Sequence, residues 1–252
     1  MSNDWFQFNK FKIKQEQCAM KVGTDGVLLG AWATMPHTEN KVHSKTICTL
    51  PVSHILDIGM GTGLIALMMA QRYPTAVVYA IDIDAGACIQ ANENVLASPF
   101  ADRVVVQNVP LQQFTAHIRF DAIVSNPPYF IDSLRNPDDK RQLARHTDSL
   151  SYYDLCQHAY RLLSHYGNFS VVLPTNYVDR FVSEATIAGF FLSKQCWVQT
   201  CMRKPPKRCL MTFTKVRPTI LDVQQCAMQD VTGDKSEWFK RLTKDFLATP
   251  IP

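Results

Sequence analysis

The sequence has no Cys-x-x-Cys pair among its eight cysteines, which are scattered along 252 residues. Structural zinc sites need clustered cysteine and histidine ligands, so we expect no metal requirement. Thiols in a cytosolic chain of this size are normally reduced, and we expect no disulfides.

Long apolar runs are also missing. A membrane helix needs roughly 20 consecutive apolar residues, and no stretch approaches that length. The opening residues lack both the basic and the apolar region of a secretory signal. We therefore expect a cytoplasmic protein. The apolar content of 46% and the mean hydropathy of -0.09 are typical of a globular chain.

The net charge of +4 is a mild excess, which permits nucleic-acid binding without requiring it. Its distribution is more informative, because the positive side chains gather in an N-terminal arm and in one short segment near residue 205. The members of the two groups are Lys10, Lys12, Lys14 and Lys21, and Arg203, Lys204, Lys207 and Arg208.

From residue 54 onward, apolar segments of two kinds alternate. The predicted strands cover residues 54–58, 77–81, 103–107, 120–125 and 168–173. The predicted helices cover residues 64–72, 85–97, 152–163 and 177–188. Near-continuous apolar strands that alternate with helices indicate a parallel sheet covered on both faces.

Two later strands, at 193–200 and 209–214, have no helix between them. So short a connection joins only antiparallel neighbours. We therefore predict an α/β fold with a seven-stranded, mostly parallel, doubly wound sheet and an antiparallel terminal strand. Within one compact domain we expect an N-terminal extension and connecting loop, the core, and a C-terminal helical tail, at residues 1–53, 54–216 and 217–252.

A glycine-rich turn joins the first predicted strand to the first predicted helix. Glycine lets backbone amides approach a ligand closely. The dinucleotide-binding pattern would need a third glycine at position 64, which is leucine, and the spacing here is Gly59-x-Gly61-x-Gly63. This form, preceded by Asp57, resembles the first motif of class I S-adenosylmethionine-dependent methyltransferases, whose seven-stranded layout also matches. The resemblance implies that the glycines border the methionine part of the donor and that Asp57 fixes the loop. A purely structural turn is the alternative.

Acidic residues after the second strand extend this comparison. Asp82 lies close to the roughly 20-residue offset at which an acid meets ribose hydroxyls in related folds, and a carboxylate can accept from both hydroxyls. Asp84 is better explained as a helix cap. The resemblance also implies an acid after the third strand to bind the donor's adenine, but Val109 stands there. We expect Asn108 or a backbone group to replace it.

The tetrapeptide Asn126-Pro127-Pro128-Tyr129 closes another predicted strand. Its prolines fix two φ angles and keep the preceding residue out of helical geometry, so the turn is stiff. Neither proline can donate a backbone hydrogen bond. The tetrapeptide is therefore a group of acceptors beside a flat ring; an incidental turn is the alternative.

These acceptors suit methyl transfer to an exocyclic amino group, whose lone pair is delocalised into the ring. If the Asn126 side-chain oxygen and the Pro127 carbonyl accept its two hydrogens, the nitrogen is drawn toward tetrahedral geometry. Positioning and charge complementarity can then supply most of the rate, and stacking on Tyr129 contributes about 1–3 kcal/mol. The same motif occurs in enzymes that methylate adenine, guanine or protein glutamine, so it indicates a type of nitrogen only.

The N-terminal stretch favours one substrate. Residues 11–15 and 20–32 closely resemble the start of the bacterial tRNA(Val) adenine-6-amino methyltransferases, which modify the base 3′ of the anticodon. Further similar segments lie at 144–146, 204–208 and 239–246. We therefore expect a tRNA adenine-N6-methyltransferase that uses S-adenosylmethionine and acts as a monomer.

Two other readings stay open. Release-factor glutamine methyltransferases carry an additional helical domain, ribosomal guanine methyltransferases commonly carry a duplicated one, and 252 residues leave no room for either. A protein-glutamine or rRNA amino-methyltransferase is nevertheless the alternative, and a non-catalytic donor-binding or RNA-binding module is the third reading.

The same resemblance implies roles for charged residues. The segment 21–25 is expected to fold over the donor's amino-acid end, with Asp25 as contact; Asp25 is equally a candidate helix cap, and the two roles are compatible. Arg145 and His146 are expected either to touch RNA or to order the loop after the clamp, the name used here for Asn126-Pro127-Pro128-Tyr129. The expected phosphate contacts are Arg203, Lys204, Lys207 and Arg208, supported by Lys10, Lys12 and Lys14. The alternative is that these charges only form a solvated surface.

Overall fold

The computed structural model describes residues 4–18, 21–36, 52–128 and 150–247. Tyr129, Arg145 and His146 lie outside these ranges. The strands are β1 (Trp5–Gln7), β2 (Lys12–Lys14), β3 (His54–Ile58), β4 (Val77–Asp82), β5 (Val104–Asn108), β6 (Phe120–Ser125), β7 (Leu163–Pro174), β8 (Phe191–Cys201), β9 (Arg208–Thr214) and β10 (Asp222–Gln229). The helices are α1 (Thr24–Trp32), α2 (Leu64–Arg72), α3 (Ala85–Leu96), α5 (Tyr152–Leu162), the short η3 (Thr175–Tyr177), α6 (Val178–Ile187) and α7 (Glu237–Thr243).

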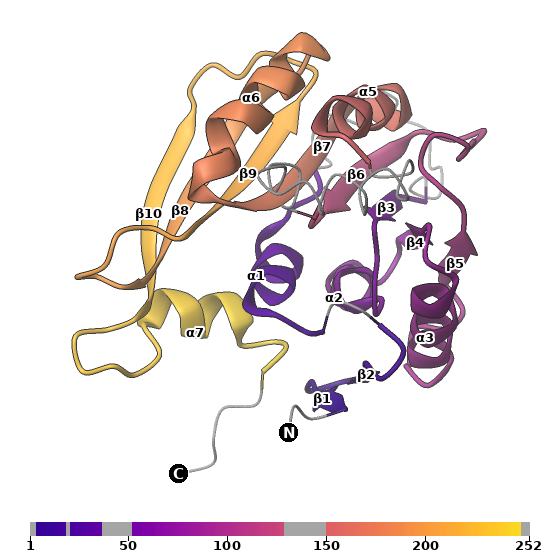
Figure 1. The fold of residues 1–252 in the computed structure, drawn as a ribbon, viewed down its shortest axis with the longest axis horizontal. Helices are drawn as coiled ribbons and strands as arrows, with labels where there is room; N and C mark the ends of the chain where they lie inside the picture. The colour runs from indigo at the N-terminus through magenta and orange to yellow at the C-terminus, as the bar shows by residue number, and fades with distance from the viewer. Residues whose placement is uncertain (1–3, 19–20, 37–51, 129–149, 248–252) are drawn as a thin grey trace, which may run out of the picture.

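One large sheet organises the molecule (Figure 1). Its strand order is β10-β8-β9-β7-β6-β3-β4-β5, and β1 and β2 form a separate hairpin. The strands from β3 to β7 pair in parallel, whereas β9 is antiparallel to both β7 and β8. The predicted alternation of strands and helices and the predicted antiparallel hairpin are therefore confirmed.

The sheet has eight strands rather than seven. The additional strand, β10, lies in the region predicted to be a helical tail, and it pairs in parallel with β8 at the edge of the sheet. The reversed strand β9 lies inside the sheet because it pairs with β7 on one side and β8 on the other. The sequence hides β10 because its first four residues are all exposed and include two glutamines, so no apolar alternation marks it. Backbone pairing with β8 makes it a strand.

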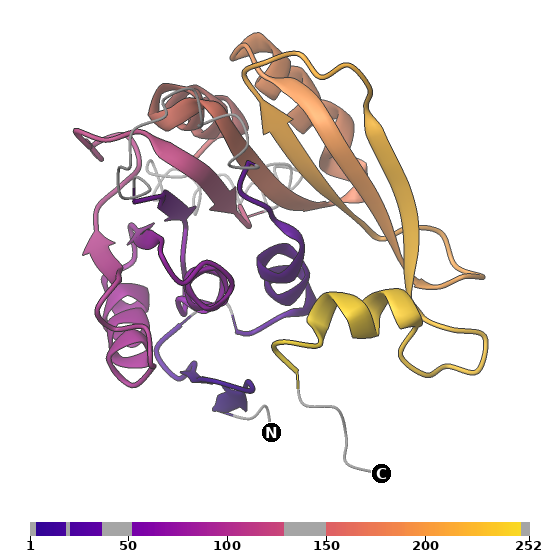
Figure 2. The ribbon, with the colours of Figure 1, turned by 180° about the vertical axis from the view of Figure 1, so that it is seen from behind.

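Helices cover both faces of the sheet (Figure 2). One apolar cluster joins α1, α2, α3 and the end of the chain, with Leu28, Leu67 and Phe246 among its buried members. The other cluster joins α5 and α6, with Leu155 and Phe181 buried. Strand β6 is buried at every residue, as expected for a strand between two helical layers.

Helix α1 lies very close to α2, because glycines face the contact. A Cβ at Gly30 would stand 2.7 Å from Met68 Sδ, and one at Gly26 would stand 3.1 Å from Leu64 Cδ2. Arg72, at the end of α2, donates to the Gly30 carbonyl at 3.1 Å, which satisfies a carbonyl in the last turns of α1. The N-terminus of α1 is thereby held beside the glycine-rich turn.

The N-terminal extension packs on the core through α3. The Asn94 side chain accepts from the Lys14 N–H at 2.8 Å and donates to the Lys14 carbonyl at 2.9 Å. It also donates to the Thr62 carbonyl at 3.0 Å, within the glycine-rich turn. One buried amide thus ties the extension, α3 and the turn together. Among the described helices, none has the length and apolarity needed to cross a membrane.

Candidate active site

The glycine-rich turn has a conformation that requires glycine. Gly59, Gly61 and Gly63 have φ angles of 73°, 52° and 79°, in the region where a side chain is strained. A Cβ at Gly59 or Gly61 would meet nothing within 4 Å, so open space lies in front of both. Gly63 differs, because a Cβ there would stand 3.3 Å from that of Ala91 on α3. The first two glycines leave room for a ligand, and the third allows helix packing.

Asp57, in the strand before the turn, is linked to the helix that follows it. Its side chain is fully buried, and Oδ2 accepts a hydrogen bond from the Ala66 N–H in α2 at 3.0 Å. Burial raises the pKa of Asp57 to about 7, the Ala66 hydrogen bond opposes this shift and the nearby Asp82 carboxylate adds to it. Asp57 therefore connects the end of β3 to the first turn of α2, on the two sides of the glycine-rich turn, and it borders neither of the cavities described next.

Two cavities open beside the turn. The strand-end cavity, of about 270 Å³, has mainly apolar walls, and its polar lining side chains are Asp82, Gln112, Ser125 and Asn126. The helix-side cavity, of about 210 Å³, lies between residues 21–26, the start of α2, Asn126 and Arg208. The residues that border both cavities are Gly59, Gly61 and Asn126.

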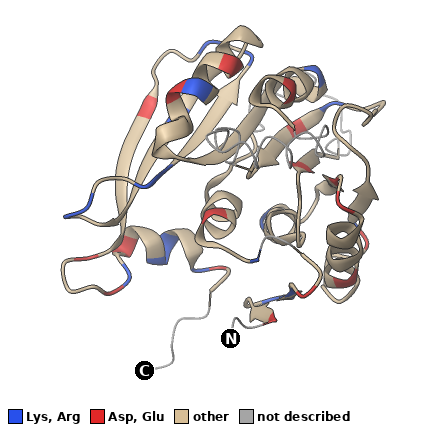
Figure 3. Ribbon diagram, viewed as in Figure 1, with Lys and Arg blue, Asp and Glu red and all other residues tan. Residues whose placement is uncertain are grey.

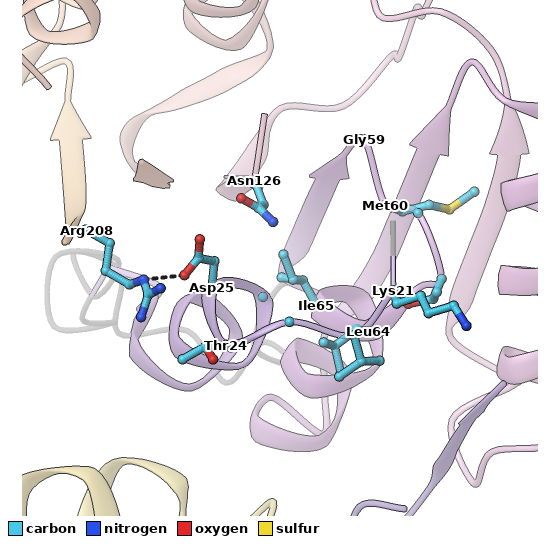
Figure 4. A pocket seen from close by; sticks show the side chains of 14 residues that line it. Lys21, Thr24, Asp25, Gly59, Met60, Leu64, Ile65, Asn126 and Arg208 are labelled. Carbon is cyan, nitrogen blue, oxygen red and sulfur yellow. Dashed lines mark ion pairs between the residues drawn. The ribbon is translucent and has the colours of Figure 1, made fainter. Parts of the chain in front are cut away.

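Strand pairing brings the Asn-Pro-Pro turn to the glycines. Ser125 is in register with Ile58, and its hydroxyl donates to the Ile58 carbonyl at 2.9 Å. Asn126 therefore begins its turn beside Gly59 (Figure 4). Pro127 and Pro128 line the strand-end cavity. The glycine-rich turn and residues 126–128 thus share one cavity; Tyr129 lies outside the described residues.

Asp82, predicted to bind the ribose hydroxyls of the donor, stands at the end of β4. Its Oδ2 accepts from the Gly61 N–H at 2.9 Å and its Oδ1 from the Asp84 N–H at 3.0 Å, so the carboxylate also orders the turn. Asp84 caps α3 as predicted, accepting from the Gly86 N–H at 2.7 Å. In the described ranges, no group of three or more His, Cys, Asp or Glu is arranged to hold a metal.

Asn108, the expected replacement for the missing acid, is hydrogen-bonded to the end of β4. Its amide nitrogen donates to the carbonyls of Asp82 and Ile83, both at 3.0 Å, and the residue borders neither cavity. The Val109 N–H is also used, donating to the Asp82 carbonyl at 3.0 Å. Gln112, which sequence reasoning missed, lines the strand-end cavity after β5. No local sequence signal marks it.

Asp25 is not the helix cap predicted from the sequence. Helix α1 begins at Thr24, its N-cap is Gly23, and no side chain caps it. A capping residue must stand before the first helical residue, whereas Asp25 is the second residue of the helix. Its carboxylate instead forms an ion pair with Arg208 Nε, drawn in Figure 4. Both residues line the helix-side cavity with Asn126.

The remaining cations form two separate groups. Arg203, Lys204 and Lys207 are exposed in the connection from β8 to β9, which carries positive charge to the outer edge of the molecule (Figure 3). The members of the other group, on or beside the β1–β2 hairpin, are Lys10, Lys12 and Lys14, all exposed. The hairpin contacts α3 and lies apart from the β8–β9 connection in Figures 1 and 2.

The chain matches a known family and proteins that carry a specific name. The methyltransferase small domain matches residues 44–177. A protein of Parabacteroides distasonis named tRNA1(Val) (adenine(37)-N6)-methyltransferase is 43% identical over 248 residues, which cover 98% of each chain. A protein of the same name from Phocaeicola vulgatus is 44% identical over 251 residues, again covering 98% of each.

A solved structure shares the fold. A predicted O-methyltransferase from Agrobacterium tumefaciens superposes with a TM-score of 0.62 and covers 90% of this chain and 98% of its own. The two sequences are 15% identical, so the likeness concerns the arrangement of strands and helices.

Proposed function

The chain belongs to the tRNA1(Val) (adenine(37)-N6)-methyltransferase family, and from this premise we propose how its site works. It is an S-adenosylmethionine-dependent methyltransferase, and its reaction is methyl transfer to the 6-amino group of the adenine beside the anticodon of tRNA-Val. One observation carries the assignment of roles: Asn126 borders both cavities together with Gly59 and Gly61. The similarity over nearly the full chain favours tRNA adenine over the protein-glutamine and rRNA alternatives.

The described residues fit the donor. The open space over Gly59 and Gly61 admits a ligand close to the backbone. We assign the strand-end cavity to the adenosine part, with Asp82 for the ribose hydroxyls, and the helix-side cavity, with Asp25, to the methionyl part. S-adenosylmethionine supplies a methyl group on a positively charged sulfur. Gly59, Gly61 and Gly63 shape the turn, Asp57 supports it, and Asn108 supports the end of β4 rather than touching the donor.

Asn126 and Pro127 orient the target nitrogen. The Asn126 side-chain oxygen and the Pro127 carbonyl accept the two amino hydrogens, and Pro128 keeps the turn stiff. The nitrogen gains the methyl group as the bond from that carbon to the donor sulfur breaks, which leaves the sulfur neutral, and the nitrogen releases one proton to solvent. Because the carbonyl positions are set before the substrate arrives, little reorganisation is needed at the moment of transfer. Tyr129 follows directly in the chain and is proposed to stack on the base.

Exposed cations hold the tRNA. Arg203, Lys204 and Lys207 are the proposed phosphate contacts, with the hairpin lysines, Arg145 and His146 in support. An unpaired anticodon-loop base reaches the clamp at lower cost than a base inside a duplex. We propose that the protein acts as a monomer in the cytoplasm and needs no metal ion, because the positively charged sulfur already makes the methyl group a strong electrophile.

The test is incubation with labelled S-adenosylmethionine and total tRNA from a strain that lacks the enzyme. We expect label in N6-methyladenosine of one valine tRNA, next to the anticodon, after nucleoside analysis. Total ribosomal RNA and release factors serve as competing substrates in parallel reactions. Label in ribosomal RNA or in a release factor, with none in tRNA, would replace the proposal by its alternative.

A further inference from the structure

The ion pair between Asp25 and Arg208 joins the N-terminal segment to the sheet across the helix-side cavity. Arg208 Nε contacts Asp25 Oδ1, and the two side chains are only 20% and 21% exposed. Both contacting atoms are shielded from solvent. In Figure 4 the Asp25 carboxylate stands between the Arg208 guanidinium and Asn126. The pair is therefore part of the wall beside the reacting group.

Arg208 is the fixed partner of the pair. It is the first residue of β9, and its backbone is in register with Pro174 of β7 and Val198 of β8. Its Nη1 atom also lies 3.9 Å from Met228 Sδ in β10. Asp25 stands in the first turn of α1, a helix without a side-chain cap. The pair therefore joins the start of α1 to a strand whose backbone is paired on both sides.

Arg208 also differs in kind from its cationic neighbours. Lys207 and Arg203 are exposed, whereas Arg208 is half-buried. Separating a shielded ion pair is costly, because each charge loses an oppositely charged partner in a place that water reaches poorly. A guanidinium that is paired with Asp25 inside the cavity wall cannot also contact a phosphate outside the wall unless the pair breaks. The positive residues near position 205 thus have two different roles, a contact with Asp25 for Arg208 and phosphate binding for the exposed residues.

We propose that Arg208 is a positioning residue that holds Asp25 in the wall of the helix-side cavity, and that it does not bind tRNA phosphates. The inference rests on the proposed function, since it takes this cavity to receive the methionyl part of the donor. A carboxylate near the N-terminus of a helix is favoured by the helix dipole, and Arg208 selects the direction in which that carboxylate points.

A double-mutant cycle tests the coupling. The variants are Asp25→Asn, Arg208→Gln and the double substitution, and the measurement is the Kd for S-adenosylmethionine by calorimetry without tRNA. We expect each single change to weaken donor binding about tenfold. The double variant should bind the donor as well as the weaker-binding of the two single variants, because the two residues act through one contact. Effects of the two changes that multiply in the double variant would overturn the proposal.

The neighbouring Lys207 provides the matched control. Lys207→Gln should raise the Kd for tRNA and leave the Kd for the donor unchanged. Arg208→Gln should raise the Kd for the donor and leave the Kd for tRNA unchanged. Arg208→Lys, which keeps the charge, should restore part of the donor affinity and remains informative if Arg208→Gln does not fold. Weaker tRNA binding by Arg208→Gln or Arg208→Lys, with donor affinity intact, would show a phosphate contact instead. Because donor binding is measured without RNA, the result stands even if the protein methylates a different substrate.

Discussion

At the scale of single residues, Asn126 combines a stiff backbone with a position between two cavities. The prolines after it restrict the turn, and the Ser125 hydrogen bond to the Ile58 carbonyl holds the preceding residue on β3. A side-chain oxygen placed in this way need not be ordered when a substrate amino group arrives. We therefore expect the residue to act in the transfer step more than in donor binding.

Replacing Asn126 with Ala should lower kcat by about 100-fold or more, the cost of losing one preorganised polar contact in an active site. The Kd for S-adenosylmethionine should stay close to that of the wild type. Single-turnover methylation and calorimetry measure the two quantities. Asn126→Asp is the matched control, since it keeps an acceptor oxygen and should retain more activity than the Ala variant. Turnover of Asn126→Ala at a tenth of the wild-type rate or better would rule out the clamp.

Secondary-structure elements carry two further properties of the site. Helix α1 reaches the cavity because its glycines let it approach α2, and the β8–β9 connection carries exposed cations away from the sheet. The position of α1 depends on side-chain packing, and the role of the β8–β9 connection depends on charge. The two properties can be tested separately.

Gly30→Ala should destabilise the protein, because the added Cβ would stand 2.7 Å from Met68 Sδ and 2.9 Å from Met68 Cβ. Overpacking of this kind costs about 1–3 kcal/mol. Urea unfolding measures the change. Gly23→Ala is the control, since its Cβ would meet only the Lys21 carbonyl oxygen, at 3.8 Å. Equal unfolding free energies for the two variants would mean that α1 can move away from α2 without cost.

Combined replacement of Arg203, Lys204 and Lys207 by Ala should weaken tRNA binding and flatten its dependence on salt. Each phosphate contact that is lost lowers the slope of log K against log[salt] by about 0.7–0.9. Binding titrations between low and moderate salt measure the slope. The same substitutions at Lys10, Lys12 and Lys14 give a comparison surface of equal charge. An unchanged slope for the first variant would remove the β8–β9 connection from the RNA surface.

At the scale of the whole molecule, the buried Asp57 links folding to pH. Burial raises its pKa to about 7 in the folded state, above the roughly 3.9 of an unfolded chain. The folded protein therefore holds a proton that the unfolded chain releases between about pH 4 and pH 7. The stability that this proton provides is complete below pH 4 and is lost as the pH rises through 7.

Asp57→Asn should remove this dependence, because the neutral amide resembles the protonated acid and can still accept from the Ala66 N–H. Relative to the wild type, the variant should gain unfolding free energy as the pH rises from 4 to 8. Denaturant unfolding at several pH values measures the difference between the two proteins, so that other titrating groups cancel. A difference that does not change with pH would show that Asp57 titrates normally.

The sequence alone determined whatever depends on a few neighbouring residues. Glycine spacing predicts the backbone of the turn at Gly59–Gly63, consecutive prolines predict the stiffness after Asn126, and a short connection predicts that β8 and β9 are antiparallel. These are limits on φ and on chain reach, and they hold wherever the segment lies. Together they indicated the fold and the type of chemistry.

Only the tertiary structure decided which distant groups meet. The register of Ile58 with Ser125 places the clamp beside the glycines, and pairing with β8 turns the polar segment Asp222–Gln229 into a strand. The amide of Asn108 faces the end of β4 instead of a cavity, and Arg208 faces Asp25 instead of solvent. Each outcome depends on a partner far away in the chain, and the free energy of such a contact exists only once the sheet has brought the two together.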